Sequence, residues 1–252
     1  MAFVPDDLKS EFAAYVRRTL TPAAERFGLE KKSGEKETIS LMRPGLVAML
    51  GEEGESEEVV AYATRLARNY LKNAASVDPS LVRTSLRLAA MRGDRRLFDE
   101  YKQRLEAAQI PAERSHFLAA LGAFRDPSLR DEALDYALSG PLRPQEIFAV
   151  VRGVSSTEES RDRVFLWITE RYDTILERVP PTFTSFMPVY ASGCSAERLE
   201  AARLFFSDPE HSSPAIEIQL AKVAEGVNDC IGLREREGAA VAAYLKDLGT
   251  EP

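Results

Sequence analysis

The sequence predicts an all-α fold, a HEAT/armadillo-like α-solenoid of antiparallel helix pairs with about 12–13 helices and a concave inner face. Alanine, leucine, glutamate and arginine, all strong helix formers, supply 112 of the 252 residues. Apolar residues recur at helical spacing, and alternating apolar and polar runs are almost absent. The tetrapeptide Asp-Pro-Ser-Leu occurs at 78–81 and 126–129, each time before a helix and a glycine turn. Repetition at about 40–47 residues is typical of HEAT-like helix pairs, although a plain helical bundle could use the same start twice.

Six helices are expected in the first half of the chain. Pro44 lies inside the second, where it removes a hydrogen-bond donor and crowds the preceding turn. Ser56 is the expected N-cap of the third. Asp78 and Asp126 are expected to accept bonds from free amides at helix starts, each with proline at the first helical position. The six expected helices cover residues 7–27, 38–50, 56–75, 79–92, 94–108 and 111–124.

Seven further helices are expected in the second half. One is a long amphipathic helix that ends at the Pro180-Pro181 pair. Its apolar side is formed by Phe165, Ile168, Tyr172, Ile175 and Leu176. No connecting stretch shows a clear change of composition, so we expect one continuous domain over residues 1–252. The seven expected helices cover residues 127–139, 142–154, 156–178, 182–194, 195–207, 213–231 and 236–248.

Charge and hydropathy argue against several classes of partner. The 33 basic and 40 acidic residues give a formal net charge of -7, and an acidic chain is a poor non-specific ligand of nucleic acid. The longest apolar stretch, at 118–124, has about seven residues, whereas a membrane-spanning helix needs about 20. The first ten residues carry neither the basic nor the apolar region of a signal peptide. We therefore expect no nucleic-acid or membrane partner and a cytoplasmic location for the chain as given.

Two cysteines, Cys194 and Cys230, lie 36 residues apart without a Cys-x-x-Cys motif. This spacing excludes a thiolate metal finger and a framework of several disulfides. The sequence allows one disulfide between the two, but buried free cysteine is a common small apolar residue. We expect two buried free thiols.

No motif predicts a catalytic residue or a metal ligand in this chain. The two histidines, His116 and His211, lie outside any His-Glu-x-x-His pattern, and phosphate-binding glycine loops are absent. We expect His116 to be a structural or surface residue and His211 to be solvated in a polar loop. The acidic cluster from Glu52 to Glu58 is expected to form a solvated loop and a helix start, where negative charge is favourable.

An ordered series of short motifs runs through residues 121–154. It consists of a leucine-glycine pair, Asp-Pro-x-Leu, an Ala-Leu-Ser helix end and an arginine followed two residues later by glutamine. The residues are Leu121-Gly122, Asp126-Pro127 with Leu129, Ala137-Leu138-Ser139, and Arg143 with Gln145, followed downstream by Arg161. The series resembles the C-terminal helical domain of zinc aminopeptidases of the puromycin-sensitive and endoplasmic-reticulum type. The resemblance extends over residues 7–248.

The chain departs from that family pattern at a few positions. Glu146 replaces the usual aspartate of the Arg-x-Gln-Asp segment. Phe165 and Trp167 stand in swapped order, and Tyr172 occupies the place of a later tryptophan. Exchanges among aromatic residues fit a role in core packing better than direct contact with a ligand.

The resemblance implies a domain without an active site of its own. In that family a catalytic domain, with its zinc site and general base, precedes the helical domain, which arches over the active-site cleft. The chain is therefore expected not to hydrolyse peptides alone, and its expected partners are its own N-terminal catalytic domain and a peptide substrate. Zinc is expected only in the full-length enzyme, with no cofactor in this chain. The expected role is to cover the cleft and help bind and size-select the peptide.

Arg143 and Gln145 are the first candidates for peptide contact. They stand at the start of a predicted helix, where an arginine and free amides suit a carboxylate. The competing interpretation is that they brace neighbouring repeats and cap the turn. Phe124 and Arg125 are weaker candidates ahead of the second Asp-Pro pair. Two further hypotheses stay open: a free-standing helical-repeat adaptor that binds a protein segment in its groove, and an enzyme with an unfamiliar active site.

Overall fold

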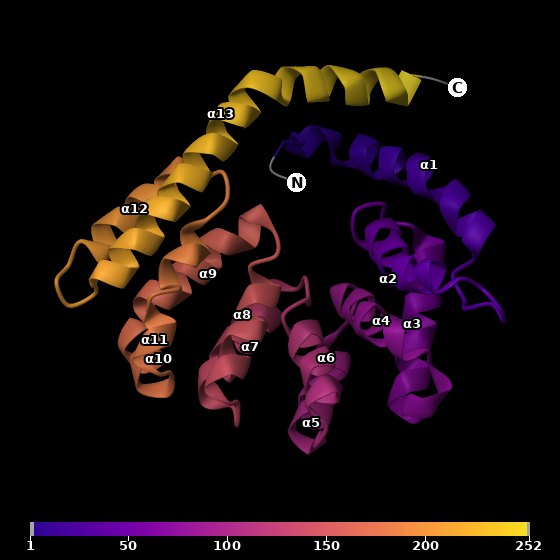
Figure 1. Cartoon of the computed structure of the whole chain (residues 1–252), viewed down its shortest axis with the longest axis horizontal. Helices are drawn as coiled ribbons and strands as arrows, with labels where there is room; N and C mark the ends of the chain where they lie inside the picture. The colour runs from indigo at the N-terminus through magenta and orange to yellow at the C-terminus, as the bar shows by residue number, and fades with distance from the viewer. Residues whose placement is uncertain (1–2, 251–252) are drawn as a thin grey trace. The chain divides into compact units, whose positions relative to one another are not determined.

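The computed structural model describes residues 3–250, and within that range every regular element is helical (Figure 1). Thirteen α-helices and three short 3-10 helices follow one another, with no strand among the described residues. Successive helices pack against one another, as α1 does on α2 and α3 on α4. These features confirm the all-α, helical-repeat prediction.

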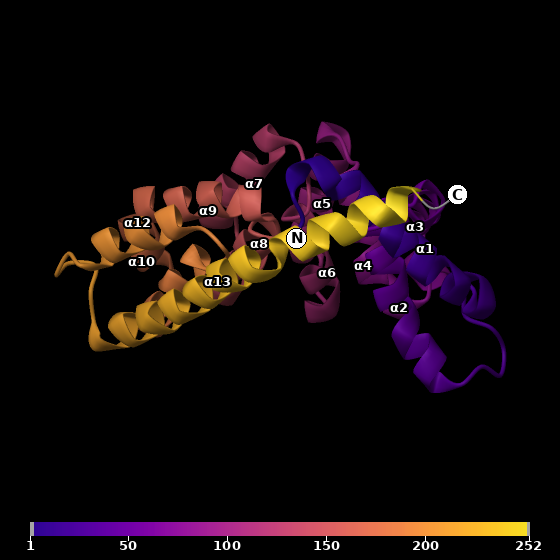
Figure 2. The same ribbon diagram turned by 90° about the horizontal axis from the view of Figure 1, so that it is seen from above.

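Helices α1 to α6 occupy the first half of the chain, and helices α7 to α13 the second (Figures 1 and 2). The early helices are α1 (Lys9–Phe27), α2 (Glu37–Glu52), α3 (Glu57–Lys72), α4 (Pro79–Met91), α5 (Arg95–Ala107) and α6 (Pro111–Leu121). The later ones are α7 (Pro127–Ser139), α8 (Pro144–Val154), α9 (Glu158–Glu170), α10 (Tyr172–Arg178), α11 (Pro181–Thr184), α12 (Ala196–Phe206) and α13 (Pro214–Thr250). The 3-10 helices are η1 (Asp6–Leu8), η2 (Ala74–Ser76) and η3 (Met187–Ala191).

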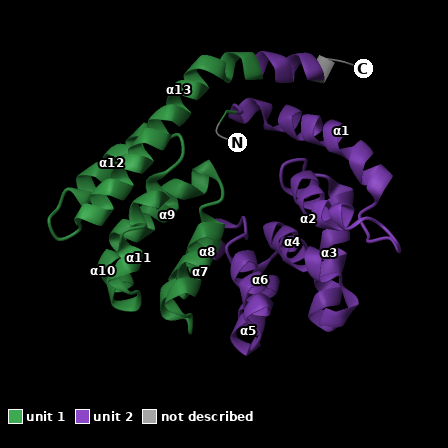
Figure 3. Cartoon of the chain, in the orientation of Figure 1, with its two compact units in different colours: residues 1–3, 130–241 green, residues 4–129, 242–252 purple. Residues whose placement is uncertain are grey.

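The chain divides into two compact units (Figure 3). One contains residues 4–129 together with the end of α13, and the other contains residues 130–241. The core of the first includes a cluster in which Phe98 and Tyr101 of α5 meet Phe124 edge-on, at centroid distances of 5.1 and 6.0 Å. In the second, Trp167 of α9 is 2% exposed and Phe206 of α12 is equally buried. Each unit therefore has its own apolar core, while the expected single domain stays a prediction.

The two Asp-Pro starts form N-caps as predicted. The Asp78 carboxylate accepts the amide of Ser80 at 2.9 Å and its hydroxyl at 2.8 Å. The Asp126 carboxylate accepts the corresponding amide and hydroxyl of Ser128 at 2.9 and 2.6 Å. Ser56 caps α3 through a bond from the amide of Val59 to its hydroxyl at 3.4 Å. These side chains replace partners that the first helical amides lack within the helix.

Arginine side chains bind main-chain oxygens at the ends of neighbouring helices. Arg178 of α10 donates to the oxygens of Leu138, Gly140 and Leu142, at and just beyond the end of α7. Arg104 of α5 donates to the last turn of α3 at Leu71. Further arginine donors of this kind are Arg17 to Gly54, Arg43 to Phe27 and Gly28, Arg114 to Leu105, and Arg161 to Ser155. We call these contacts arginine caps.

The arginine caps of Arg17, Arg104 and Arg178 join residues that are 33–40 positions apart in the sequence. Carbonyl groups at a helix end lack intrahelical partners and carry partial negative charge, which a cation satisfies. The planar guanidinium presents five donors, so one side chain can serve several oxygens. The sequence contains 25 arginines and 8 lysines. Six of the 25 arginines form these caps.

The predicted helix over 156–178 is wrong at one point, because Arg171 separates α9 from α10. Arg171 has φ -112° and ψ 14°, outside helical geometry. The break turns α10 so that Tyr172 and Ile175 are buried, as expected, whereas Leu176 is 38% exposed. Leu176 therefore does not belong to the apolar side.

The helix predicted over 182–194 is also wrong. Only α11 and η3 form there, and both are short. Pro181 and Pro188 supply no amide donor, and Gly193 adopts φ +120°. Each missing donor weakens the helical ladder, and Gly193 leaves helical geometry altogether, so the segment forms only short turns.

The last two predicted helices are a single one, since α13 runs unbroken from Pro214 to Thr250 (Figure 2). Gly232 and Gly238 lie inside it. An internal glycine costs a helix only about 1 kcal/mol relative to alanine and does not end it. The number of helices agrees with the prediction because this fusion offsets the extra break at Arg171.

The expectation of free thiols is wrong. Cys194 and Cys230 form a disulfide with a Cα–Cα distance of 5.3 Å, and the structure shows no free cysteine. Cys194 lies just before α12 and Cys230 lies in α13. The 35 intervening residues fold back to bring them together, which spacing alone does not reveal.

Candidate peptide-binding surface

Helix α8 presents the two strongest sequence candidates to solvent. Arg143 is the N-cap residue and Gln145 lies in the first turn, and both are exposed. Glu146, which is only 8% exposed, turns back to accept the Arg143 amide on its Oε2 at 2.9 Å. This bond fixes the backbone at the entry to α8 and leaves both candidate side chains on the surface.

The free amides expected at this helix start are mostly committed. Pro144 has no amide hydrogen, and the amide of Glu146 already donates to the Arg143 oxygen at 2.8 Å. The Glu146 carboxylate adds negative charge at the same helix end. A bound carboxylate would therefore be contacted by the Arg143 guanidinium and the Gln145 amide, with little help from the helix amides.

An aromatic stack continues this surface along α8. Phe148 lies one turn beyond Gln145, and its ring stacks on Phe183 of α11 with a centroid distance of 5.8 Å and an interplanar angle of 8°. Tyr190 of η3 approaches Phe148 at 6.3 Å and 25°. Phe186, between α11 and η3, is 61% exposed. Sequence reasoning missed this stack because it assigned 182–194 to a regular helix.

Phe183 and Tyr190 of the stack lie in an uncharged stretch, and Phe148 lies in α8, which carries an exposed arginine. Residues 179–196 contain no charged side chain. Burial raises the pKa of the Tyr190 phenol, and the nearby Arg152 cation opposes that shift. Arg143 and Arg152 are both exposed on α8, one at each side of Phe148 in sequence. The surface thus combines aromatic faces with cations, which suits a peptide that carries an apolar side chain and a carboxylate.

The weaker candidates lie in the other unit. Phe124 is 1% exposed and packs against Phe98 and Tyr101. Arg125 is exposed and pairs with Glu55 at 3.7 Å. Phe124 therefore contributes to the core, whereas Arg125 faces solvent beside an acidic partner. Peptide contact by all four candidates stays a prediction.

The acidic cluster is partly engaged in ion pairs. Glu52 pairs with Arg87 at 2.8 Å. Burial raises the pKa of the Glu52 carboxyl group, although the Arg87 cation acts to lower it. Glu57 and Glu58 lie in the first turn of α3, as expected for a helix start. Within residues 3–250 no group of three or more His, Cys, Asp or Glu side chains is placed to hold a metal ion.

His211 is less solvated than expected, whereas the half-buried position of His116 agrees with the structural or surface role expected for it. His211 stacks on Phe205 at 4.1 Å and meets Tyr172 edge-on at 4.8 Å, so it packs on aromatic rings and is only half-exposed. His116 is half-buried, with its Nδ1 enclosed and unbonded, and burial lowers its pKa.

No described helix is long and apolar enough to cross a membrane.

Comparison with known proteins identifies the family. Residues 1–229 match the family described as the ERAP1-like C-terminal domain. The chain belongs to this family, and the resemblance drawn from its motifs is confirmed.

The relatives are themselves called aminopeptidases. Mitochondrial aminopeptidase 2 of Saccharomyces cerevisiae is 20% identical over 98% of this chain, and aminopeptidase N of Lactococcus lactis is 25% identical over 97%. Aminopeptidase M1-A of Oryza sativa is 25% identical over 66% of the chain. The chain spans only 26%, 29% and 19% of the lengths of these three relatives. It corresponds to the C-terminal part of such enzymes.

Proposed function

We propose that this chain is a non-catalytic domain that covers the active-site cleft of an aminopeptidase and helps to bind and size-select the peptide. The observation that carries the proposal is the family match over residues 1–229 in a chain that spans about a quarter of its aminopeptidase relatives. Its partners are then a catalytic domain and a peptide. Zinc belongs to that catalytic domain, and no residue of this chain is assigned to it.

The exposed side of α8 supports a peptide contact. Arg143 and Gln145 supply a cation and an amide, and the Phe148–Phe183 stack supplies apolar area a turn away. A guanidinium binds a carboxylate through paired donors, and aromatic faces give contact area at a small cost in side-chain entropy. The proposed occupant is the part of a peptide that lies away from its reacting N-terminus.

Peptide titration of the purified chain tests this proposal. Binding of peptides with a free or an amidated C-terminus is measured by isothermal titration calorimetry. We expect the free carboxylate to bind more tightly, and Arg143→Ala and Phe148→Ala each to weaken binding by roughly tenfold, the effect of about 1.4 kcal/mol. Arg171→Ala, an exposed arginine of the same unit, is the matched control and should bind as the parent does. Equal affinity of all three variants would contradict the assignment of this surface.

A free-standing adaptor is the alternative function. A helical-repeat chain can bind a protein segment along its groove without belonging to an enzyme. Affinity purification of the chain from its native source separates the two. Recovery with an aminopeptidase catalytic region, in the same or a separate polypeptide, supports the first proposal. Recovery with a defined partner unrelated to aminopeptidases supports the adaptor.

Activity and location are tested separately. The chain alone, supplied with zinc, should not turn over aminoacyl-amide substrates, and turnover would overturn its non-catalytic role. A cytoplasmic location also stays a proposal. Disulfides persist mainly in oxidising compartments, so fractionation combined with thiol labelling of Cys194 and Cys230 in the native source checks location and redox state together.

A further inference from the structure

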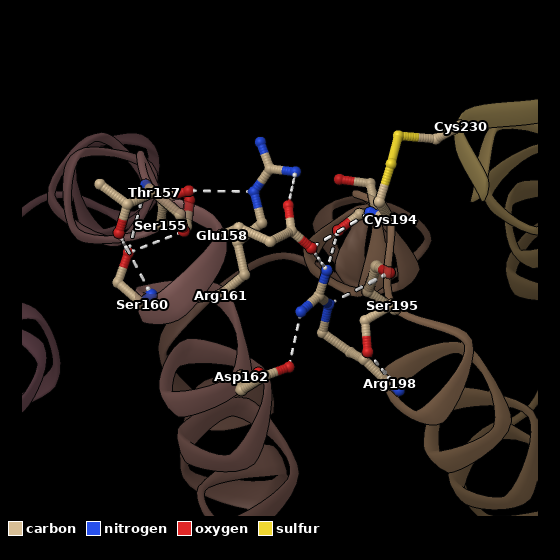
Figure 4. Close-up of polar contacts among 12 residues, drawn as sticks. Ser155, Thr157, Glu158, Ser160, Arg161, Asp162, Cys194, Ser195, Arg198 and Cys230 are labelled. Carbon is tan, nitrogen blue, oxygen red and sulfur yellow. Dashed lines mark hydrogen bonds and ion pairs between the residues drawn. A yellow bond between two sulfur atoms is a disulfide. The ribbon is translucent and has the colours of Figure 1, made fainter. Parts of the chain in front are cut away.

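The disulfide joins Cys194, which lies beside a network of polar contacts, to Cys230 of α13 (Figure 4). Cys194 lies in the loop before α12 and is 2% exposed. Cys230 lies on α13 and is half-exposed. A reagent from solvent therefore reaches the sulfur of Cys230 before that of Cys194.

The Cys194 side is held by a polar network. The amide of Cys194 donates to Oε1 of Glu158 at 3.1 Å, and the same carboxylate pairs with the buried guanidinium of Arg198. Arg198 also contacts Asp162 at 2.6 Å and donates to the oxygen of Ser192 at 2.8 Å. These bonds do not involve sulfur, so the loop keeps its position when the disulfide opens.

The Cys230 side depends on the disulfide. Ile216, Val223 and Val227 are the buried side chains of α13 in this unit, and all three precede Cys230. None of the residues 228–241 is fully buried, and residues 233–237 are exposed. Gly232 and Gly238 weaken the helix in the same stretch. The disulfide is thus the last anchor of α13 in this unit.

We propose that Cys194–Cys230 is a thiol–disulfide exchange site whose co-reactant is a dithiol, and that its opening loosens residues 228–241 of α13, the stretch between the buried Val227 and the buried Leu245. A thiolate of the dithiol attacks Sγ of Cys230, the sulfur–sulfur bond breaks, and its electron pair leaves on Cys194, which takes up a proton. The second thiolate of the dithiol then attacks the dithiol's own first sulfur in the mixed disulfide. Cys230 leaves as a thiolate and is protonated. The dithiol loses two electrons to the protein and becomes a disulfide. This inference is independent of the proposed peptide function.

Hydrogen exchange on the oxidised and reduced chain tests this loosening. Dithiothreitol is added to the native protein, and amide exchange is followed by mass spectrometry. We expect the disulfide to open without unfolding and the amides of 228–241 to exchange at least tenfold faster, while those of α9 and α12 keep their protection. Unchanged exchange at 228–241, equal acceleration throughout the unit, or reduction only after unfolding would each overturn the proposal.

The order of accessibility gives a second readout. After reduction, brief alkylation with iodoacetamide should modify Cys230 at least tenfold faster than Cys194, because only Cys230 lies on a loosened segment. Equal rates, or faster modification of Cys194, would contradict the mechanism. The double variant Cys194→Ala and Cys230→Ala should reproduce the exchange pattern of the reduced chain. If that variant does not fold, the oxidised and reduced states of the unsubstituted chain still decide the question.

Discussion

Arg198 and Glu158 lie 40 residues apart in the sequence, and their side chains form an ion pair in which the guanidinium side chain is only 1% exposed. Burial raises the pKa of the Glu158 carboxyl, but hydrogen bonds from Arg198 and from the Cys194 amide outweigh it, so the net shift is downward. The pair therefore joins the start of α9 to the first turn of α12 as a charged, hydrogen-bonded contact.

Loss of the Arg198 side chain should destabilise this unit. Arg198→Ala removes the pair and leaves the oxygens of Ala191 and Ser192 without that donor. We expect the free energy of unfolding to fall by about 2 kcal/mol, the scale of a lost hydrogen bond to a charged group, because the Glu158 side chain that remains is 33% exposed. Urea denaturation followed by the fluorescence of Trp167 measures it. Arg203→Ala, whose pair with Glu200 is exposed, is the control and should change stability by less than about 1 kcal/mol.

The arginine caps predict that lysine cannot replace arginine at these sites. Arg178→Lys keeps the charge but has one ammonium group where the guanidinium serves three main-chain oxygens. We expect a loss of about 1–2 kcal/mol, the scale of a hydrogen bond to a charged group. Thermal unfolding by circular dichroism measures it. Arg171→Lys on the same unit should leave the midpoint unchanged, and an equal effect of the two substitutions would contradict the role given to the caps.

The Asp78 cap should contribute measurably to stability. Asp78→Ala removes the acceptor of the Ser80 amide and should cost about 1 kcal/mol. Asp78→Asn keeps a good capping residue and should recover most of the loss. Asp126→Ala should act in the same direction at the start of α7. Full stability of both alanine variants in chemical denaturation would contradict these helix boundaries.

A buried ion pair between α2 and the preceding loop predicts a pH dependence. Hydrogen bonds from Arg43 and Ser40 lower the pKa of Glu35 to about 2. Because the folded pKa lies below that of the unfolded chain, the stabilisation is fully present above about pH 4.5 and is lost as the pH falls towards 2. Urea unfolding between pH 6 and pH 3 should show this decline. Glu35→Gln should flatten it, and an equal slope in both proteins would assign the acid sensitivity to other groups.

Local rules in the sequence predicted the helices with strong starts. Ser56, Asp78 and Asp126 each cap a helix because their oxygens reach amides two or three residues on, which is a property of the nearby chain alone. The break at Arg171 has no comparable local signal, and Gly232 lowers helix propensity without ending α13. Propensity at Gly232 therefore did not predict the outcome.

The sequence also predicted only the part of the candidate site that depends on local residues. Arg143 and Gln145 were found from a local helix start, and both prove exposed. The aromatic stack requires Phe148 and Phe183 to meet across 35 residues, and the disulfide requires a similar return of the chain. Contacts of this kind, like the arginine caps, depend on how helices pack, and a single sequence contains no local signal for them.

The covalent link between Cys194 and Cys230 also determines how the chain responds to force. When tension is applied through the two termini, the disulfide transmits it directly, and the 35 residues between the cysteines are shielded from extension. In an optical trap the oxidised protein should lengthen by less than the reduced one, by the contour of that span. The redox state of one bond would thus change the length to which the chain can be extended.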